Sequence, residues 1–157
     1  HRVGEILVRG PNVMKGYLNQ PEETAKTITP DLWLRTGDLG YMDEDGFVFV
    51  TGRIKELIIK GGENIAPREI DEILLLHEDI LEAAAFSVPC QSYGERVEAC
   101  VILKSRRKPT ESQILEFCQY KLGSFKSPDR IHFKESLPKG PSGKIQRLKL
   151  FEFVYKK

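Results

Sequence analysis

The strongest constraint on the fold is a change of pattern near residue 52 of this 157-residue chain. Before it the sequence is β-rich: residues 4–9 alternate apolar and polar side chains, and residues 47–50 are β-branched or aromatic, as in paired strands. The expected helix, over residues 21–26, is short and has proline in its first turn. Because no helix there is long enough to complete a core, we expect this part to need further protein sequence to fold.

Strands and helices alternate after residue 52. We expect strands at residues 56–59, 80–88, 97–103 and 130–133, a loop at residues 60–64, and helices at residues 67–77, after a cap at residues 110–113, and at residues 144–154. Shorter strands are expected earlier, at residues 33–34 and 40–42. The order β-α-β-β-α-β-α predicts a compact α+β unit of about 100 residues.

Charge and cysteine usage exclude several classes of protein. The 24 basic and 23 acidic residues give a net charge of +1, which argues against a nucleic-acid partner. No apolar run approaches the roughly 20 residues that span a bilayer. Three widely spaced cysteines without a CxxC pair indicate reduced thiols in a reducing compartment, the cytoplasm by default, rather than a disulfide framework or a metal site.

Two short segments offer groups that suit a nucleotide. In residues 35–38 (RTGD), Asp38 follows a glycine, and its carboxylate can accept two hydrogen bonds from a vicinal diol such as a ribose. In residues 52–56 (GRIKE), Arg53 can contact a phosphate or ribose through its planar donors. Taken alone, the alternatives are favoured: an aspartate that closes a turn and solvated surface charge.

Two loops carry more specific signals. Gly61 and Gly62 let the backbone approach a narrow ligand closely, although a flexible strand-to-helix connection explains them about equally well. Residues 138–144 (PKGPSGK) lack the GxxxxGK[ST] spacing of a nucleotide-binding P-loop. They place Lys144 on a loop restricted by prolines, which suits stabilisation of charge on a phosphate or carboxylate oxygen; the alternative is an exposed loop that starts a helix.

These segments, in this order and preceded by Gly4-Glu5 and Gly16-Tyr17, resemble the C-terminal part of AMP-forming acyl-CoA synthetases. That group belongs to the adenylate-forming superfamily, with aryl-CoA ligases, peptide-synthetase adenylation domains and luciferase. The resemblance covers essentially the whole chain. It implies that residues 1–51 end a large N-terminal AMP-binding domain, residues 52–55 form a hinge, and residues 56–157 form an α+β lid with a mixed sheet and flanking helices.

The resemblance also implies roles in adenylation. Asp38 and Arg53 match residues that hold the ribose, and Asn64 falls where some relatives place an amide near the adenylate. Lys144 matches the catalytic lysine that reaches the substrate carboxylate and the α-phosphate. An ammonium there stabilises the charge of an in-line displacement without transferring a proton.

The second half-reaction is implied to use another face of the lid. Lys55 matches the hinge about which the lid rotates, after which Gly61 and Gly62 line the pantetheine tunnel. Ile59 stands where luciferases and plant aryl-CoA ligases carry a lysine, so that contact is missing.

The implied reactants are a carboxylic acid, ATP and coenzyme A, with AMP as a product and Mg²⁺ bound mainly by the N-terminal domain. The phosphate loop and acyl pocket of the family are expected upstream of His1, so we expect these residues alone to be inactive. Fatty, short-chain, dicarboxylic and aryl acids stay open as substrates. Two alternatives are an adenylation module that loads a carrier protein and a non-catalytic nucleotide-binding relative.

Overall fold

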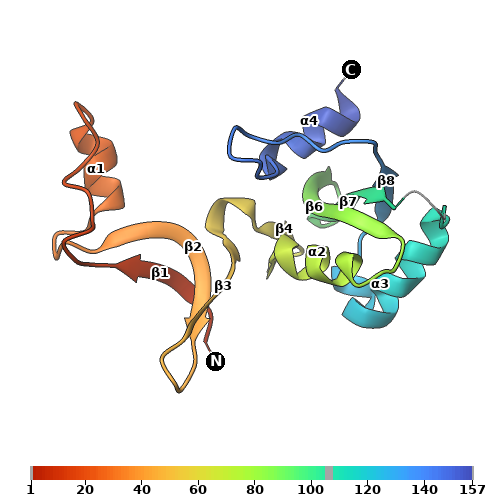
Figure 1. The fold of residues 1–157 in the computed structure, drawn as a ribbon, viewed down its shortest axis with the longest axis horizontal. Coiled ribbons are helices and arrows are strands. Elements are labelled where there is room, and N and C mark those ends of the chain that lie inside the picture. The colour runs from red at the N-terminus through yellow and green to blue at the C-terminus, as the bar shows by residue number, and fades with distance from the viewer. Residues whose placement is uncertain (1, 105–107, 157) are drawn as a thin grey trace. The chain divides into compact units, whose positions relative to one another are not determined.

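The fold was analysed in a computed structural model that describes residues 2–104 and 108–156. Contacts within the chain divide it into two compact units, His1–Lys55 and Glu56–Lys157 (Figure 1). The assignment of these parts to an N-terminal domain, a hinge and a lid stays a prediction.

The first unit is a three-stranded antiparallel sheet with one short helix. Its strands β1 (Gly4–Val8), β2 (Leu34–Met42) and β3 (Val48–Arg53) pair in sequence order, and α1 (Pro21–Thr27) lies between β1 and β2 in the chain. The two short strands expected at residues 33–34 and 40–42 are one strand, β2, whose register with β3 shifts between Leu39 and Gly40. A Cβ at Gly40 would lie 2.4 Å from the Phe49 carbonyl oxygen. The close approach of β2 and β3 at this register shift therefore requires glycine.

The second unit is built on a five-stranded mixed sheet. Its elements are η1 (Ile54–Glu56, which begins in the first unit), β4 (Ile58–Lys60), β5 (Glu63–Ile65), α2 (Pro67–Leu75), β6 (Ile80–Cys90), β7 (Gly94–Leu103), α3 (Glu111–Lys126), β8 (Arg130–Phe133), η2 (Arg147–Lys149) and α4 (Leu150–Tyr155). β7 is central: it pairs antiparallel with β6 and β4 and parallel with β8. The predicted α+β class and mixed sheet are confirmed.

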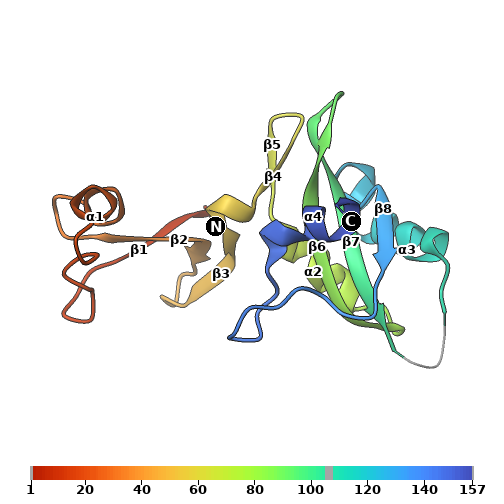
Figure 2. The ribbon, with the colours of Figure 1, turned by 90° about the horizontal axis from the view of Figure 1, so that it is seen from above.

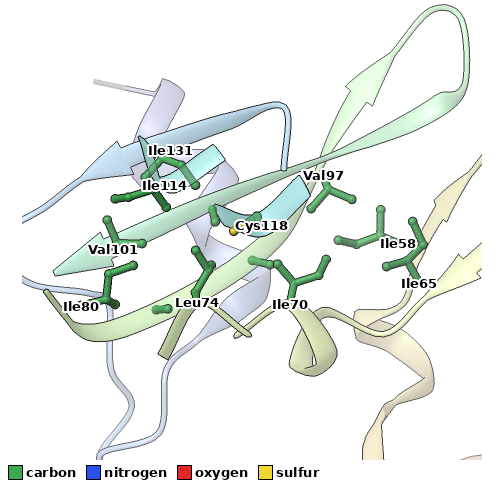
Figure 3. Close-up of a cluster of buried hydrophobic side chains, with 13 residues drawn as sticks. Ile58, Ile65, Ile70, Leu74, Ile80, Val97, Val101, Ile114, Cys118 and Ile131 are labelled. Atoms are coloured by element: carbon green, nitrogen blue, oxygen red, sulfur yellow. The ribbon is translucent and has the colours of Figure 1, made fainter. Parts of the chain in front are cut away.

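Alternation along β6 and β7 produces two cores, one on each face of the sheet. On one face, small and branched side chains meet α2 and α3, as Figure 3 shows for Val97, Val101, Ile70, Leu74 and Ile114. On the other face, Ala84, Phe86, Val88 and Cys100 pack against Leu137 and Leu150. The unit therefore has three layers, with α2 and α3 on one face and α4 on the other (Figure 1).

The cysteines are free, as expected. Cys100 and Cys118 are buried, and Cys90 is partly buried. Burial raises the pKa of the Cys100 thiol and of the Cys118 thiol to about 11. Both buried thiols therefore behave as small apolar core residues.

Two expectations are corrected. Residues 60–64 are not a loop, because Lys60 ends β4 and Glu63 begins β5. Residues 144–154 are not one helix: the Gly140 N–H donates to the Lys144 carbonyl, and Ile145 forms an antiparallel bridge with Lys139. This pairing holds the start of the segment extended, so the α-helix covers only Leu150–Tyr155.

The other helices agree closely with the pattern. The hydroxyl and backbone N–H of Thr110 complete a capping box with Gln113 at the start of α3, and α2 ends at Leu75, two residues before the expected end. In the ranges that the structure describes, no helix is both long and apolar enough to cross a membrane.

Candidate functional site

Asp38 and Arg53 are neighbours in the first unit. They are paired residues of β2 and β3, and Arg53 Nε lies 2.9 Å from Asp38 Oδ1. Their side chains are 49% and 30% exposed, for Arg53 and Asp38 respectively, so both keep polar atoms free for a ligand from solvent. The two residues singled out separately in the sequence therefore form one charged pair.

The backbone that presents Asp38 is shaped by the residues before it. Gly37 has φ +72°, a left-handed conformation that favours glycine. The Thr36 hydroxyl accepts a hydrogen bond from the Asp38 N–H at 3.0 Å and donates to the Ile6 carbonyl at 2.8 Å. Glu5, to which the sequence assigned no role, accepts the Gly37 N–H at 3.2 Å. In the sequence it was marked by its place in an alternating strand and in the Gly4-Glu5 pair, but neither indicated this contact.

Lys55 lies in η1, exposed, at the last residue before the second unit begins. Its role as the hinge about which the lid rotates stays a prediction.

Gly61 and Gly62 form a tight turn between β4 and β5. Their φ values are +57° and +86°, as in the two-residue type I′ turn of a hairpin. The Gly61 N–H donates to the Tyr93 carbonyl at 2.9 Å, which joins this tip to the turn between β6 and β7. The two glycines are therefore part of a defined hairpin rather than a flexible connection, and Asn64 lies exposed on its second strand.

The hairpin is anchored by an internal lysine. Lys60 is only 5% exposed, and its Nζ donates to the Phe125 carbonyl at 2.9 Å and lies 3.8 Å from Asp129 Oδ2. This anchor attaches the turn end of β4 to the end of α3.

Lys144 lies on a different loop of the second unit. It is exposed, and no carboxylate in the described ranges lies within ion-pairing distance of it. A turn closed by the Gly143 N–H and the Gly140 carbonyl at 2.9 Å precedes it. In Figure 2 the hairpin of β4 and β5 and the loop that precedes η2 lie at opposite ends of this unit. The structure therefore does not bring Lys144 together with Gly61 and Gly62.

A largely buried ionic cluster follows the Lys144 loop, and the sequence analysis missed it. Arg147 of η2 reaches Asp71 of α2 at 2.6 Å and Glu56 at 3.1 Å. Burial raises the pKa of the Asp71 carboxyl, against the opposing effect of the Arg147 guanidinium. Local sequence patterns could not reveal these contacts, because Arg147 is 76 residues from Asp71 and 91 residues from Glu56 in the chain.

Comparison with known proteins shows which proteins this chain is similar to. Residues 69–144 match the family described as AMP-binding enzyme C-terminal domain. A sulfoacetate–CoA ligase of Cupriavidus necator is 52% identical over 95% of this chain and 29% of its own length. The chain thus spans less than a third of the length of that relative.

Two solved structures are similar over almost the whole chain. ATP-bound MatB from Rhodopseudomonas palustris matches with a TM-score of 0.92 and 36% identity, over 99% of this chain and 31% of its own. The o-succinylbenzoate CoA synthetase of Bacillus subtilis, in complex with its acyl-adenylate intermediate, matches with a TM-score of 0.86 and 36% identity, over 96% and 30%.

Proposed function

We propose that this chain is the C-terminal part of an AMP-forming acid–CoA ligase, because residues 69–144 match the AMP-binding enzyme C-terminal domain and the similar proteins include CoA ligases. In the first step a carboxylate oxygen of the acid attacks the α-phosphorus of ATP, and pyrophosphate leaves. In the second step the thiol sulfur of coenzyme A attacks the acyl carbon, the thiol proton is lost, and AMP leaves.

The observation that carries this proposal is the separation of two functional loops on one compact unit. The Lys144 loop and the Gly61–Gly62 hairpin lie at opposite ends of it (Figure 2), so one orientation cannot direct both at the same reaction centre. A unit that reorients between two half-reactions explains both loops. Lys55, at the boundary of the units, is the position about which we propose that it turns.

Each proposed site residue has a local chemical basis. The exposed ammonium of Lys144 is free to approach an incoming carboxylate and the α-phosphate, where negative charge builds up on oxygen. Asp38 and Arg53 offer adjacent acceptors and donors for the ribose, and Asn64 offers an amide to the adenylate. The rigid turn of Gly61 and Gly62 has no side chain at its tip, which suits a wall of the pantetheine channel.

Magnesium would enter with ATP. As the resemblance implies, we assign Mg²⁺ mainly to the N-terminal domain of the family and no step in this chain to it. Free cysteines favour a reducing compartment such as the cytoplasm.

The acid is determined outside this chain. The relatives named for sulfoacetate and for o-succinylbenzoate match it over 95% and 96% of its length, although the two acids differ greatly in size and shape. We therefore expect this region to perform steps common to all such substrates.

The test is AMP release by the intact protein that carries this chain, with ATP, magnesium and a panel of acids, with and without coenzyme A. AMP formation that requires both an acid and coenzyme A supports the ligase. Acid-dependent pyrophosphate exchange without a response to coenzyme A would indicate a carrier-protein module. No reaction with any acid would indicate a non-catalytic relative.

Lys144→Ala tests the assigned catalytic group. We expect the rate of acyl-adenylate formation to fall about 100-fold or more, with ATP affinity nearly unchanged. The matched control is Lys139→Ala on the same loop, which removes only a surface ion pair to Glu82 and should leave adenylation near the wild-type rate. Equal losses in both variants would contradict the assignment.

A further inference from the structure

The loop that carries Lys144 returns to the body of the second unit at Arg147, an arginine that is largely buried. The Arg147 side chain is 14% exposed, and it meets acceptors from three separate segments. Its Nε lies 3.1 Å from Glu56 Oε2, one terminal nitrogen lies 2.6 Å from Asp71 Oδ2, and the other donates to the Ala85 carbonyl at 2.5 Å. One guanidinium thus joins η1, α2 and β6.

The receiving groups are themselves fixed. Asp71 Oδ1 accepts the Ala85 N–H at 2.6 Å, so the carboxylate is oriented by the backbone of β6 on one side and by Arg147 on the other. A planar guanidinium can meet three acceptors in fixed directions at once, whereas a lysine ammonium of similar length cannot reproduce this fork. The position therefore requires arginine, not only a positive charge.

Arg147 is close in the chain to both moving parts of the proposed mechanism. It lies three residues after Lys144, and between them the Gln146 N–H donates to the Pro138 carbonyl at 2.8 Å, which closes the base of the loop. Its other partner, Glu56, directly follows Lys55. The hydrophobic residues Leu137 and Leu150 also anchor this segment, so loss of Arg147 alone should loosen the loop rather than unfold the unit.

We propose that Arg147 is a positioning residue, which holds the base of the Lys144 loop and the segment after the hinge in one arrangement through Glu56 and Asp71. This inference rests on the proposed function of Lys144. It predicts that Arg147 acts on adenylation, in which Lys144 takes part, and not on transfer to coenzyme A.

The test is Arg147→Lys in the intact enzyme, with the two half-reactions measured separately. We expect acyl-adenylate formation to slow by about tenfold or more, as small misplacements of a catalytic group do, with the KM for ATP nearly unchanged. Thioester formation from preformed acyl-adenylate should stay within about twofold of wild type, since the proposed second step does not use Lys144. The control is Arg68→Lys on the exposed side of α2, where Arg68 pairs with Glu72; both rates should stay near wild type.

Glu56→Gln is a milder second variant, since it keeps a hydrogen-bond acceptor and removes one charge. We expect the same selectivity for the first half-reaction with a smaller loss. Equal losses in both half-reactions, in either variant, would overturn the inference and indicate a general effect on stability.

Hydrogen exchange of the loop amides supplies a readout that does not depend on activity. The N–H groups of Gly140, Gly143 and Gln146 are hydrogen-bonded within the loop, and Arg147→Lys should speed their exchange about tenfold while α3 stays protected. Unchanged exchange would overturn the inference even if the enzyme is active. If wild type forms no acyl-adenylate, the proposed function fails, and faster loop exchange still supports the anchoring role.

Discussion

Glu98 is fully buried in the second core, yet its carboxylate is well satisfied. Arg96 Nε donates to Oε1 at 2.9 Å, and the Tyr155 hydroxyl donates to Oε2 at 2.6 Å. His132 Nε2 also lies 2.6 Å from Oε2. Burial by itself raises the pKa of Glu98, but the hydrogen bonds from Tyr155, His132 and Arg96 outweigh it, so the pKa lies below its usual value of 4.5. Ionised Glu98 therefore joins β7, β8 and α4.

This cluster predicts a pH-dependent contribution to stability. Because the pKa of Glu98 is lower in the folded state, its contribution is present above the unfolded-state value and is lost as pH falls through the folded-state value. Glu98→Gln should cost about 2 kcal/mol at pH 7, and the difference from wild type should shrink as the pH falls below 4.5. Urea unfolding of the 157-residue chain from pH 7 to pH 3 measures this.

The control for Glu98 is Glu82→Gln on β6, where the carboxylate pairs with Lys139 at the surface. Surface pairs contribute about 0–1 kcal/mol, so this variant should differ little from wild type at any pH. A Glu98→Gln difference that is the same at every pH would contradict the role of ionisation.

Among the elements, the hairpin of β4 and β5 depends most directly on its turn residues. Gly61 has φ +57°, and a Cβ there would lie 3.3 Å from the Tyr93 ring. Two separate costs are therefore expected for any other residue: a left-handed backbone and a close contact with Tyr93.

Gly61→Ala and Gly61→Asn separate these costs. Both place the same Cβ against Tyr93, but asparagine adopts the left-handed conformation more readily. We expect Gly61→Ala to lower the free energy of unfolding by about 1 kcal/mol and Gly61→Asn by clearly less, in chemical denaturation. Equal losses would show that the contact with Tyr93, and not the backbone conformation, is decisive.

At the scale of the whole molecule, the two units differ in the size of their hydrophobic cores. Both hydrophobic clusters consist of residues from Ile58 onward, whereas in the described residues of the first unit Gly40 alone is buried. In that unit β3 leaves Val48, Phe49 and Val50 exposed. Burial of apolar surface is the main stabilising contribution to a fold. The second unit therefore has a hydrophobic core that can stabilise it alone, whereas the first unit does not.

This difference predicts independent folding of one unit only. A fragment of residues 56–157 should unfold cooperatively, with a midpoint close to that of the longer chain, in thermal melts followed by circular dichroism. A fragment of residues 1–55 should show no cooperative transition, because it buries too little surface to offset its conformational entropy. Failure of residues 56–157 to fold alone would contradict this division.

Much of this fold follows from local pattern. Alternation identified the strands, Thr110 and Gln113 identified the start of α3, and Pro67 the start of α2. Predictions failed where pairing across the chain overrode local preference. Residues 144–154 have a helical pattern, but the bridge between Lys139 and Ile145 holds their start extended. The two adjacent glycines form a tight turn and not a loop, because β4 and β5 pair on either side of them.

By itself, the sequence determined the α+β class, the buried faces of the main elements and the resemblance to a family, since periodicity and motif order are local properties. Only the tertiary structure decided which of these groups meet. It paired Asp38 with Arg53, separated the Lys144 loop from the glycine hairpin, and brought Arg147 to Asp71 and Glu56. The physical reason is that burial makes a distant partner obligatory for a charge, and which residue provides it depends on strand order and register, which no local pattern contains.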